Sequence, residues 1–473
     1  MRRSFPMFVG GKPRAGAKRD LIKSPYDGST VSEVSVAQRS DMEDALASAH
    51  AARDAMRALP THERIRVLEA LAAAVRIRAD EIAELITCES GKPIRYARAE
   101  VVRATTTLSL GAHTAATLGG EVLPADIAKA GEHKLLLYKR VPRGVVGAIG
   151  PFNFPLNLLA HKVSPALAVG APIVIKPPHQ SPGVGLLLAE IALELGLPDG
   201  AVNALHAPAE VAELLARDPR VAVLSFTGSD RVGFKLKALA PDKQVLLELG
   251  GNAPCIIDET VDLESALPKI VEASWASAGQ VCIKAQRLLV AESRFDDFVE
   301  RFVAATRAVP VGDPMDERTV VGPLIEKRQI ERVLGLIREA EGAGARVLTG
   351  GRADGNLLEP TVIVDAKPEL GVCKDEVFGP VTTIEAFSDF DDAVRKANAT
   401  RFGLQASLFT RDLARALAAF ERLEYGGVIV NEPPTFRIDN FPYGGMKDSG
   451  RGREGVRFAA EEYTEPRVLV LGA

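Results

Sequence analysis

The stretch VVGAIGPFNFPLNLLAHKVSPALAVGAPIVIK, residues 145–176, is the part of this chain that most clearly indicates the fold class. It opens with the apolar run 145–149 and closes with the run 172–176, and both have the length of buried strands. Short apolar runs that alternate with helices are typical of βαβ units and of a parallel sheet. Ligands bind such sheets at the carboxyl ends of the strands, so the residues that follow these runs are candidates for a site.

The same alternation of short apolar runs and expected helices continues from this stretch toward the C-terminus. The next expected elements are a helix at 182–196, a strand at 201–205, a helix at 208–217, a strand at 221–226, a helix from 229 and a strand at 245–248. After residue 251 the pattern starts again, with strands at 253–257, 286–291 and 345–348 and helices at 262–277, 294–307 and 325–343. A chain of 473 residues is too long for one ordinary core, so we expect two or three domains.

The N-terminal third is predicted to begin with helices. Ser40 and Glu43 fit a capping box that opens a helix through about residue 56. Apolar residues at helical spacing predict one helix over 61–86, and another is expected over 91–120. Two segments, 121–140 and 461–473, alternate in polarity instead, and we expect them to form edge strands that pair with another subunit.

Composition argues against several classes of function. The net charge is −4, from 58 basic and 62 acidic residues, so no general positive field favours nucleic acid. The N-terminus lacks the apolar core of a signal peptide, and no apolar run approaches the ~18 residues of a membrane span. The four cysteines are far apart, which suits neither a zinc site nor a disulfide framework and favours a reducing cytoplasm. We expect no metal, no membrane and no nucleic-acid partner.

Four short motifs could carry chemistry. They are GPFNFP at 150–155, LELGGN at 247–252, GQVC at 279–282 and EVFGP at 376–380. Taken singly, each has an ordinary explanation: Asn153 in a turn, Glu248 as a cap or ion-pair partner, Cys282 or Phe378 in a core. Taken together and in this order, they resemble the aldehyde dehydrogenase superfamily over nearly the whole chain. The separation of Glu248 and Cys282 also matches the spacing in that family.

The resemblance implies an α/β fold with three parts. These are a Rossmann-like NAD(P)-binding domain (1–120 and 141–250), a second α/β catalytic domain (251–448), and a small β oligomerisation arm with the C-terminal tail (121–140 and 449–473). It also implies a homodimer or homotetramer. The C-terminal run from Arg437 to Gly455 is similar to the lactaldehyde, phosphonoacetaldehyde and non-phosphorylating glyceraldehyde-3-phosphate dehydrogenase branch. Members of that branch that use phosphate tend to have arginine where this chain has Val281.

The chemistry of such an enzyme explains its residue types. A thiolate that adds to an aldehyde makes a tetrahedral adduct, which loses hydride more easily than the planar carbonyl does. The resemblance assigns this nucleophile to Cys282. It assigns oxyanion stabilisation to the Asn153 amide and the Cys282 backbone N–H, and it makes Glu248 the general base for thioester hydrolysis.

The expected cofactor is NAD or NADP. Lys176 ends a strand and could reach the adenosine ribose, while Gly228 and Ser229 open a helix whose N–H groups suit a pyrophosphate. His179 stands where many NAD-preferring members have a glutamate, so the choice between the two cofactors stays open. The residues that the resemblance assigns to cofactor binding are Ile149, Lys176, His179, Gly228, Ser229, Leu249, Glu376 and Phe378.

The substrate is expected to be a small, polar and anionic aliphatic aldehyde. The family pattern places seven residues along the substrate tunnel: Asn157, Leu158, His161, Val281, Ile283, Arg437 and Tyr443. Arg103, on an earlier helix, is expected to face the same space. Arginine and histidine in a closed tunnel suit a carboxylate, phosphonate, sulfonate or phosphate. The alternative for Arg437 is a structural pair with Asp439 or Asp375.

Three other functions remain open at this point. An acylating dehydrogenase would pass the thioester to coenzyme A, but such members tend to lack the glutamate at position 248. A cysteine hydrolase without a redox step leaves Lys176 and the EVFGP motif unexplained. A catalytically silent protein on this fold leaves Asn153, Glu248 and Cys282 unexplained together.

Overall fold

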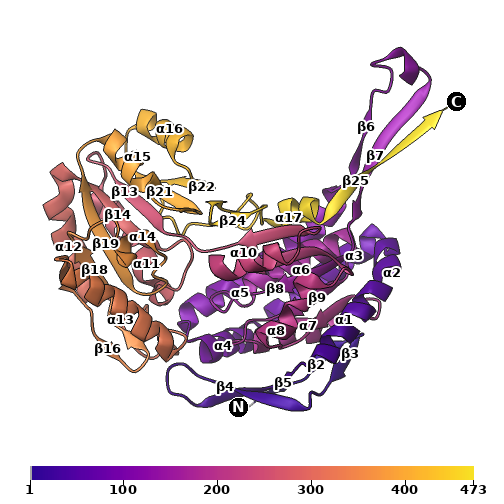
Figure 1. Ribbon diagram of the computed structural model, residues 1–473, viewed down its shortest axis with the longest axis horizontal. Coiled ribbons are helices and arrows are strands. Elements are labelled where there is room, and N and C mark those ends of the chain that lie inside the picture. Colours follow the sequence, from indigo (N-terminus) through magenta and orange to yellow (C-terminus); the bar gives the residue numbers. More distant parts are fainter. Residues whose placement is uncertain (1–2, 473) are drawn as a thin grey trace.

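The computed structural model describes residues 3–472 and contains two large α/β units and a projecting β arm (Figure 1). The first unit is built on an eight-stranded sheet of order β24-β12-β11-β8-β9-β10-β2-β3. Its strands are β2 (Met7–Val9), β3 (Lys12–Arg14), β8 (Val145–Ile149), β9 (Ile173–Lys176), β10 (Val202–Ala204), β11 (Val221–Thr227), β12 (Gln244–Glu248) and β24 (Gly450–Arg451). The five strands from β8 to β12 are parallel, which confirms the βαβ prediction.

Alternate residues of these strands enter different apolar cores. Val146 and Ala148 of β8 pack on one face of the sheet, whereas Val145 and Ile149 pack on the other. The first face is covered by α3 (Thr61–Ile77), α4 (Ala79–Ser90), α5 (Ile94–Thr117), α6 (Asn157–Val169), α7 (Gly183–Leu193) and α17 (Val456–Glu462). The second is covered by α1 (Arg39–Ala51), α8 (Ala209–Ala212), α9 (Leu214–Arg217) and α10 (Asp230–Ala238). A strand buried on both faces reads as a continuous apolar run, which is why these strands were recognisable.

The second unit has a seven-stranded sheet of order β15-β18-β19-β14-β13-β21-β22. Its strands are β13 (Ala253–Ile257), β14 (Ala285–Ala291), β15 (Arg346–Thr349), β18 (Thr361–Val364), β19 (Val381–Phe387), β21 (Gln405–Phe409) and β22 (Gly427–Val430), and only β15 runs antiparallel to its neighbour. One face carries α11 (Leu263–Trp275), α12 (Phe295–Arg307), α13 (Lys327–Gly342) and α14 (Gly371–Lys374). The other carries α15 (Phe390–Asn398) and α16 (Leu413–Arg422).

The arm is a three-stranded antiparallel sheet that extends away from both units (Figure 1). It consists of β6 (Gly120–Leu123), β7 (Lys134–Pro142) and β25 (Thr464–Gly472), so the two segments expected to be strands pair with each other. Residues 450–462 of the segment assigned to the tail lie elsewhere: β24 joins the first sheet and α17 packs on α6.

Three expectations about the N-terminal region were wrong. Strands β1 (Arg3–Phe5) to β5 (Thr30–Val36), including β4 (Lys18–Lys23), precede the first helix. The capping box is formed by Gln38 and Asp41 rather than by Ser40 and Glu43, and a short helix, α2 (Arg53–Ala58), follows α1. The helix expected over 61–86 is two helices, since Arg78 between α3 and α4 leaves the helical region with φ −97° and ψ 21°.

The remaining strands form small ribbons: β16 (Ala353–Asp354) with β17 (Leu357–Leu358), and β20 (Phe402–Gly403) with β23 (Met446–Lys447). Among the described residues, no helix combines the length and apolar character needed to cross a membrane.

Candidate active site

The carboxyl ends of the parallel strands in the first sheet lie side by side. The register pairs Ile149 with Lys176 and Phe226 with Ile149. It also pairs Thr227 with Glu248, the last residues of β11 and β12. Ligands bind parallel sheets at this edge, and the strand order reverses direction at β8, which is the switch point where a crevice forms. The candidate residues that follow these strands are therefore neighbours in space.

Cys282 lies in the loop between α11 and β14, at the amino-terminal edge of the second sheet. Ser277 and Ala278 in this loop adopt left-handed φ values of 53° and 56°, which are strained for residues with a side chain. The loop is held from the first unit by Asn153, whose Nδ2 donates to the Gln280 carbonyl at 3.0 Å. The site therefore lies where the two sheets meet.

Residue Cys282 is partly exposed, and its thiol lies beside Tyr443, with Sγ 3.4 Å from the hydroxyl oxygen. Burial raises the pKa of the Cys282 thiol to about 11, and the Tyr443 hydrogen bond opposes that rise. The Cys282 backbone N–H makes no backbone hydrogen bond among residues 3–472. Both a thiol and a free N–H are thus available to a substrate.

Glu248 ends β12 and is buried, with Oε2 lacking any hydrogen-bond partner in the described chain. Burial first, and the nearby carboxylate of Glu454 second, raise the pKa of Glu248 well above its usual value. Glu454 itself is buried and paired, with Lys162 Nζ at 3.0 Å and Arg437 Nη2 at 3.2 Å. The result is one carboxylate, Glu454, held by two cations beside a second carboxyl, Glu248, whose pKa is raised.

The residues expected to hold the cofactor include a partly exposed cation without a partner, Lys176. Among the described residues, its Nζ makes no hydrogen bond or ion pair, and desolvation lowers its pKa to about 8. A desolvated ammonium is costly unless a ligand satisfies it, so this position fits a cofactor contact. Gly228 follows β11 and Ser229 is the N-cap of α10, so helix N–H groups face the same edge.

Two further cofactor candidates come from the second unit. Glu376 accepts a hydrogen bond from the Gly251 N–H at 3.0 Å, and burial raises its pKa to about 7. Phe378 has a left-handed φ of 47° and packs edge-on against Phe152 with ring centroids 5.9 Å apart. Strained backbone of this kind tends to occur where a side chain must be presented to a ligand.

His179 belongs to a contact that the sequence did not suggest. Its ring stacks on His206 at 5.0 Å, and His206 Nε2 lies 2.9 Å from Asp20 Oδ2. Ligand atoms of these three residues lie within 4.8 Å of one another, which is close enough for a metal ion. The two rings are only 13° from parallel, an arrangement that suits stacking better than convergence of ring nitrogens on one ion.

The expected substrate residues fall into two groups. Val281, Ile283 and Tyr443 cluster around Cys282 together with Leu404 and Phe441. The polar group converges on a residue that was considered only as a structural partner, Asp439. Its carboxylate contacts Arg103 at 2.6 and 3.1 Å, His161 Nε2 at 3.0 Å and Asn157 Nδ2 at 3.2 Å.

Arg437 also has protein partners. Besides Glu454, it lies 3.8 Å from Asp439, and its guanidinium stacks over the Tyr443 ring at 3.7 Å. Its Nε is nevertheless buried with no hydrogen-bond partner among the described residues. Arg437 therefore links the polar group around Asp439 to the tyrosine beside Cys282. Of the two carboxylates considered as its structural partners, Asp439 is near and Asp375 is not among its ion-pair partners within the described chain.

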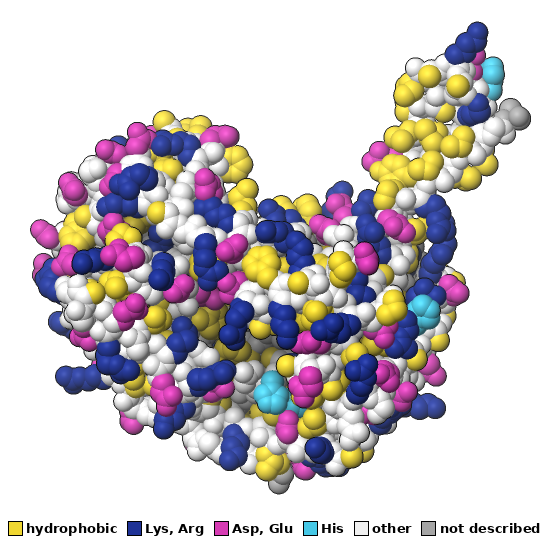
Figure 2. Space-filling model, viewed as in Figure 1, with side chains coloured by type: hydrophobic (Ala, Val, Ile, Leu, Met, Phe, Trp, Pro, Cys, Tyr) yellow, Lys and Arg dark blue, Asp and Glu magenta, His cyan; other side chains and the backbone are white. Residues whose placement is uncertain are grey.

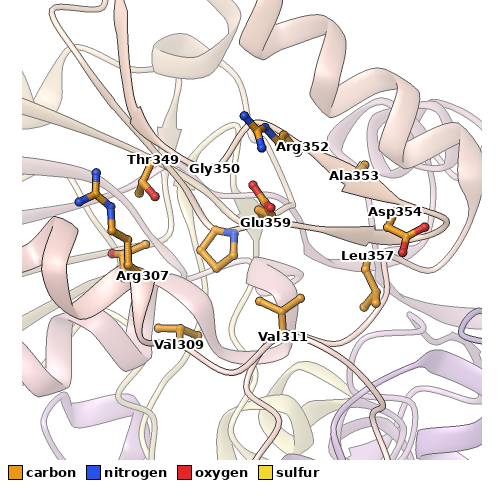
Figure 3. A pocket seen from close by; sticks show the side chains of 12 residues that line it. Arg307, Val309, Val311, Thr349, Gly350, Arg352, Ala353, Asp354, Leu357 and Glu359 are labelled. Atoms are coloured by element: carbon orange, nitrogen blue, oxygen red, sulfur yellow. The ribbon is translucent and has the colours of Figure 1, made fainter.

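One surface cleft is separate from these residues. It is lined by the end of α12 and by β15 to β17, with Arg307, Arg352 and Glu359 around it (Figure 3). None of the candidate catalytic, cofactor or substrate residues lines it. We assign no chemistry to this cleft.

Comparison with known proteins decides the family. The aldehyde dehydrogenase family profile matches residues 14–469. This chain belongs to the aldehyde dehydrogenase family. The resemblance seen in the motifs is thereby confirmed, and with it the assignment to the NAD(P)-dependent oxidoreductases.

Its relatives lie in the expected branch. A 3-sulfolactaldehyde dehydrogenase from Priestia aryabhattai is 40% identical over 99% of this chain and 98% of its own length. A lactaldehyde dehydrogenase from Methanocaldococcus jannaschii is 37% identical over 98% of this chain and 100% of its own. Among solved structures, aldehyde dehydrogenase 21 from Physcomitrella patens, in complex with its product succinate, is 41% identical with a TM-score of 0.98, covering 100% of this chain and 99% of that one.

Proposed function

We propose that this aldehyde dehydrogenase oxidises a small aliphatic aldehyde with an anionic group, through a thioester on Cys282 that is hydrolysed with Glu248. The observation that carries the proposal is the meeting of four groups where the two sheets join. These are the thiol of Cys282, the Tyr443 hydroxyl at 3.4 Å, the Glu248 carboxyl whose Oε2 has no partner, and the Asn153 amide that holds the cysteine loop.

In the first step, the Cys282 sulfur adds to the aldehyde carbon after the thiol has lost its proton. Tyr443 supports the thiolate by donating its hydroxyl hydrogen bond, since that contact lowers the pKa of the thiol. The new oxyanion is held by the free backbone N–H of Cys282 and by the second amide hydrogen of Asn153. Both donors are fixed before the substrate arrives, which is what makes such stabilisation effective.

The bound NAD or NADP would then supply the redox chemistry by accepting the hydride. The residues that fit the cofactor are the unpartnered Lys176 near the ribose, the Gly228–Ser229 helix start near the phosphates, and Glu376 with Phe378 on the nicotinamide side. Ile149 and Leu249, at the ends of β8 and β12, and His179 complete the set.

Glu248 acts in the last step. In its ionised form, the raised pKa makes it a stronger base toward water than an ordinary carboxylate, and its free Oε2 offers the position for that water. This arrangement favours hydrolysis over transfer of the acyl group to coenzyme A, for which a carboxyl base beside the thioester is not needed.

The charges near the tunnel support an anionic substrate. Arg103, Arg437 and Lys162 pair with the two carboxylates of Asp439 and Glu454, so three cations meet two carboxylates there. The names of the relatives include both anionic and neutral ligands: 3-sulfolactaldehyde and succinate carry an anionic group, whereas lactaldehyde does not. The third cation, and the Nε of Arg437 that makes no hydrogen bond, favour an anionic substrate.

We further propose that the active unit is a homodimer or homotetramer of the reducing cytoplasm. All four cysteines are free, which suits that compartment. The arm exposes apolar side chains on its surface (Figure 2), and a second copy of the chain would cover them.

A panel of aldehydes tests the proposal by the absorbance of the NAD(P)H formed. The wild type should prefer semialdehyde acids and sulfonated or phosphonated aldehydes over propanal, and Cys282→Ala should abolish oxidation while cofactor binding persists. Cys88→Ala is the matched control and should remain active. Cys88 is also a partly exposed cysteine, but it lies far from Cys282 in the sequence. Turnover by Cys282→Ala at the wild-type rate, or a preference for long alkyl aldehydes, would refute the proposal.

A further inference from the structure

The side chain of Asp439 occupies the donors that an anionic substrate would need. Four N–H groups from two helices converge on it: two from Arg103 on α5, and one each from Asn157 and His161 on α6. The carboxylate is only 5% exposed. Contacts with His161 and Arg103 hold the pKa of Asp439 far below its usual range, so it is an anion at every pH of interest.

This set of donors has the composition of an anion-recognition site. Arg103 presents Nε and Nη2 together, which is the fork geometry that binds a planar carboxylate. The His161 ring has no exposed surface, and burial and Arg437 lower its pKa, so it is neutral and donates one hydrogen to Asp439. A substrate carboxylate or sulfonate would offer the same acceptor oxygens that Asp439 offers now.

The segment that carries Asp439 is attached mainly through side chains. Residues 437–441 belong to no helix or strand of the described chain and contain a turn at 439–440, whereas Phe436 and Tyr443 on either side donate backbone hydrogen bonds to Pro433 and Glu454. Ile438 is 51% exposed, so the segment lies at the surface and Asp439 reaches inward from it. Moving this side chain out therefore breaks contacts with its partners but no secondary structure.

Arg103 is the residue around Asp439 that a ligand can reach from solvent. Its side chain is 30% exposed, in contrast to the 5–6% of Asp439 and Arg437. Arg437 stacks on Tyr443, whose hydroxyl contacts Cys282. An anionic group at Arg103 would consequently lie on a continuous line of contacts to the nucleophile.

We propose that Asp439 is an internal competitor for the substrate's anionic group: it holds Arg103, Asn157 and His161 until a substrate displaces it, and so determines how strongly acidic aldehydes bind. The inference rests on the proposed anionic substrate. Part of the binding free energy of an anionic ligand is then needed to displace Asp439. This raises KM for acidic aldehydes and leaves KM for neutral ones unchanged.

The test measures binding without turnover. Succinate, which is anionic, and propionamide, which is neutral, are titrated calorimetrically into the full-length wild type and into Asp439→Asn. The variant keeps the size of the side chain but loses its charge. We expect it to bind succinate about tenfold more tightly or better, because charge-assisted hydrogen bonds become available, and to bind propionamide as the wild type does.

Asp448→Asn is the control, because Asp448 is a carboxylate in the same C-terminal region that faces Arg401 at 3.5 Å and is 44% exposed. It should leave both affinities unchanged. Unchanged or weaker succinate binding by Asp439→Asn would overturn the inference. Thermal unfolding is followed in parallel, and Asp439→Ser serves as a second variant. If both variants fail to fold, Asp439 is a structural residue and the inference is also overturned.

Kinetics separate this inference from the proposed function. In Asp439→Asn, KM for the preferred acidic aldehyde should fall while kcat and the KM for propanal stay near the wild-type values. If the wild type oxidises no aldehyde, the proposed function fails, yet succinate binding still decides the role of Asp439. If acidic aldehydes are oxidised but KM for them does not fall, the role assigned to Asp439 fails alone.

Discussion

Tyr443 contacts the nucleophile through its hydroxyl group. The hydroxyl lies 3.4 Å from Cys282 Sγ, and this contact opposes the burial that raises the pKa of the thiol to about 11. Because only the thiolate adds to the aldehyde, kcat/KM should rise with pH from pH 6 to at least pH 9, by up to about tenfold per unit below the thiol pKa.

Tyr443→Phe should shift that profile toward higher pH. Removing the donor leaves the thiolate less stabilised, so the pKa of Cys282 increases and the activity at pH 7 falls by about tenfold, in line with one lost hydrogen bond to a charged group. Activity should recover at alkaline pH. A uniform loss at every pH would show instead that Tyr443 only shapes the pocket.

Glu248 should govern hydrolysis and not hydride transfer. Glu248→Gln removes the base but keeps the volume, so steady-state turnover should fall by about 10²–10⁴-fold. A burst of NAD(P)H close to one per active site should persist in a stopped-flow experiment, because the thioester still forms. Absence of the burst together with loss of aldehyde binding would give Glu248 a different role.

At this scale the sequence was informative about the reacting groups and less so about their partners. Cys282, Glu248 and Asn153 are recognisable because each lies in a short motif next to a strand end. The contacts of Arg103 with Asp439 join residues 336 positions apart. No local pattern reveals which carboxylate a distant arginine meets, so Asp439 was foreseen only as a possible partner of Arg437.

Among the elements, α6 carries Asn157, His161 and Lys162, and one buried carboxylate anchors its start. Glu100 on α5 accepts the N–H groups of Leu156 and Asn157 at 2.9 and 3.1 Å, and it pairs with buried Lys92 at 2.5 Å. Lys92 also lies 3.5 Å above the ring of Phe154, next to Asn153. The pair therefore supports both the helix that bears His161 and the turn that bears Asn153.

Glu100→Gln should be costly because it leaves Lys92 buried and uncompensated. Removing one partner of a buried pair typically destabilises a protein by about 3–5 kcal/mol. The double variant Lys92→Met with Glu100→Gln should recover much of that loss, since it removes the stranded charge. Chemical denaturation measures both. A single variant as stable as the wild type would mean that the pair does not anchor α6.

The helices and strands were predictable from the sequence where their burial produces a local pattern of apolar residues. Strands β8 and β9 are buried on both faces and so read as apolar runs. Strands β1 to β3 have only three residues each, too few to show a period, and they were missed. The break between α3 and α4 occurs at Arg78 without a proline or glycine, so apolar spacing alone predicted one continuous helix.

At the scale of the whole molecule, the arm is the part that the single chain leaves incomplete. Val468 and Leu469 of β25 are 62% and 45% exposed, and so are their neighbours Val470 (53%) and Leu471 (49%). Successive residues of a strand point to opposite faces, so both faces of the arm sheet present apolar side chains to solvent. Large exposed apolar surface of this kind marks an interface.

We expect the arm of one copy to pack on a second exposed surface of another copy, formed by β22 and α16. The outer strand of the second sheet, β22, has one free edge, and α16 beside it exposes Leu413 and Phe420 at 72% and 68%. Open edges and apolar helix faces are liabilities that oligomerisation removes. We therefore expect light scattering of the wild type to give about two or four times the 50.4 kDa of one chain.

Val468→Asp together with Val470→Asp should break this assembly, because alternate positions put both charges on one face of β25. The variant should run at the mass of one chain and lose most activity with it, while circular dichroism of the two α/β units stays unchanged. Ile77→Asp places the same charge on an isolated residue that is 84% exposed at the end of α3, and it should remain assembled. A fully active wild-type monomer, or a double variant that still assembles, would show that the arm has another purpose.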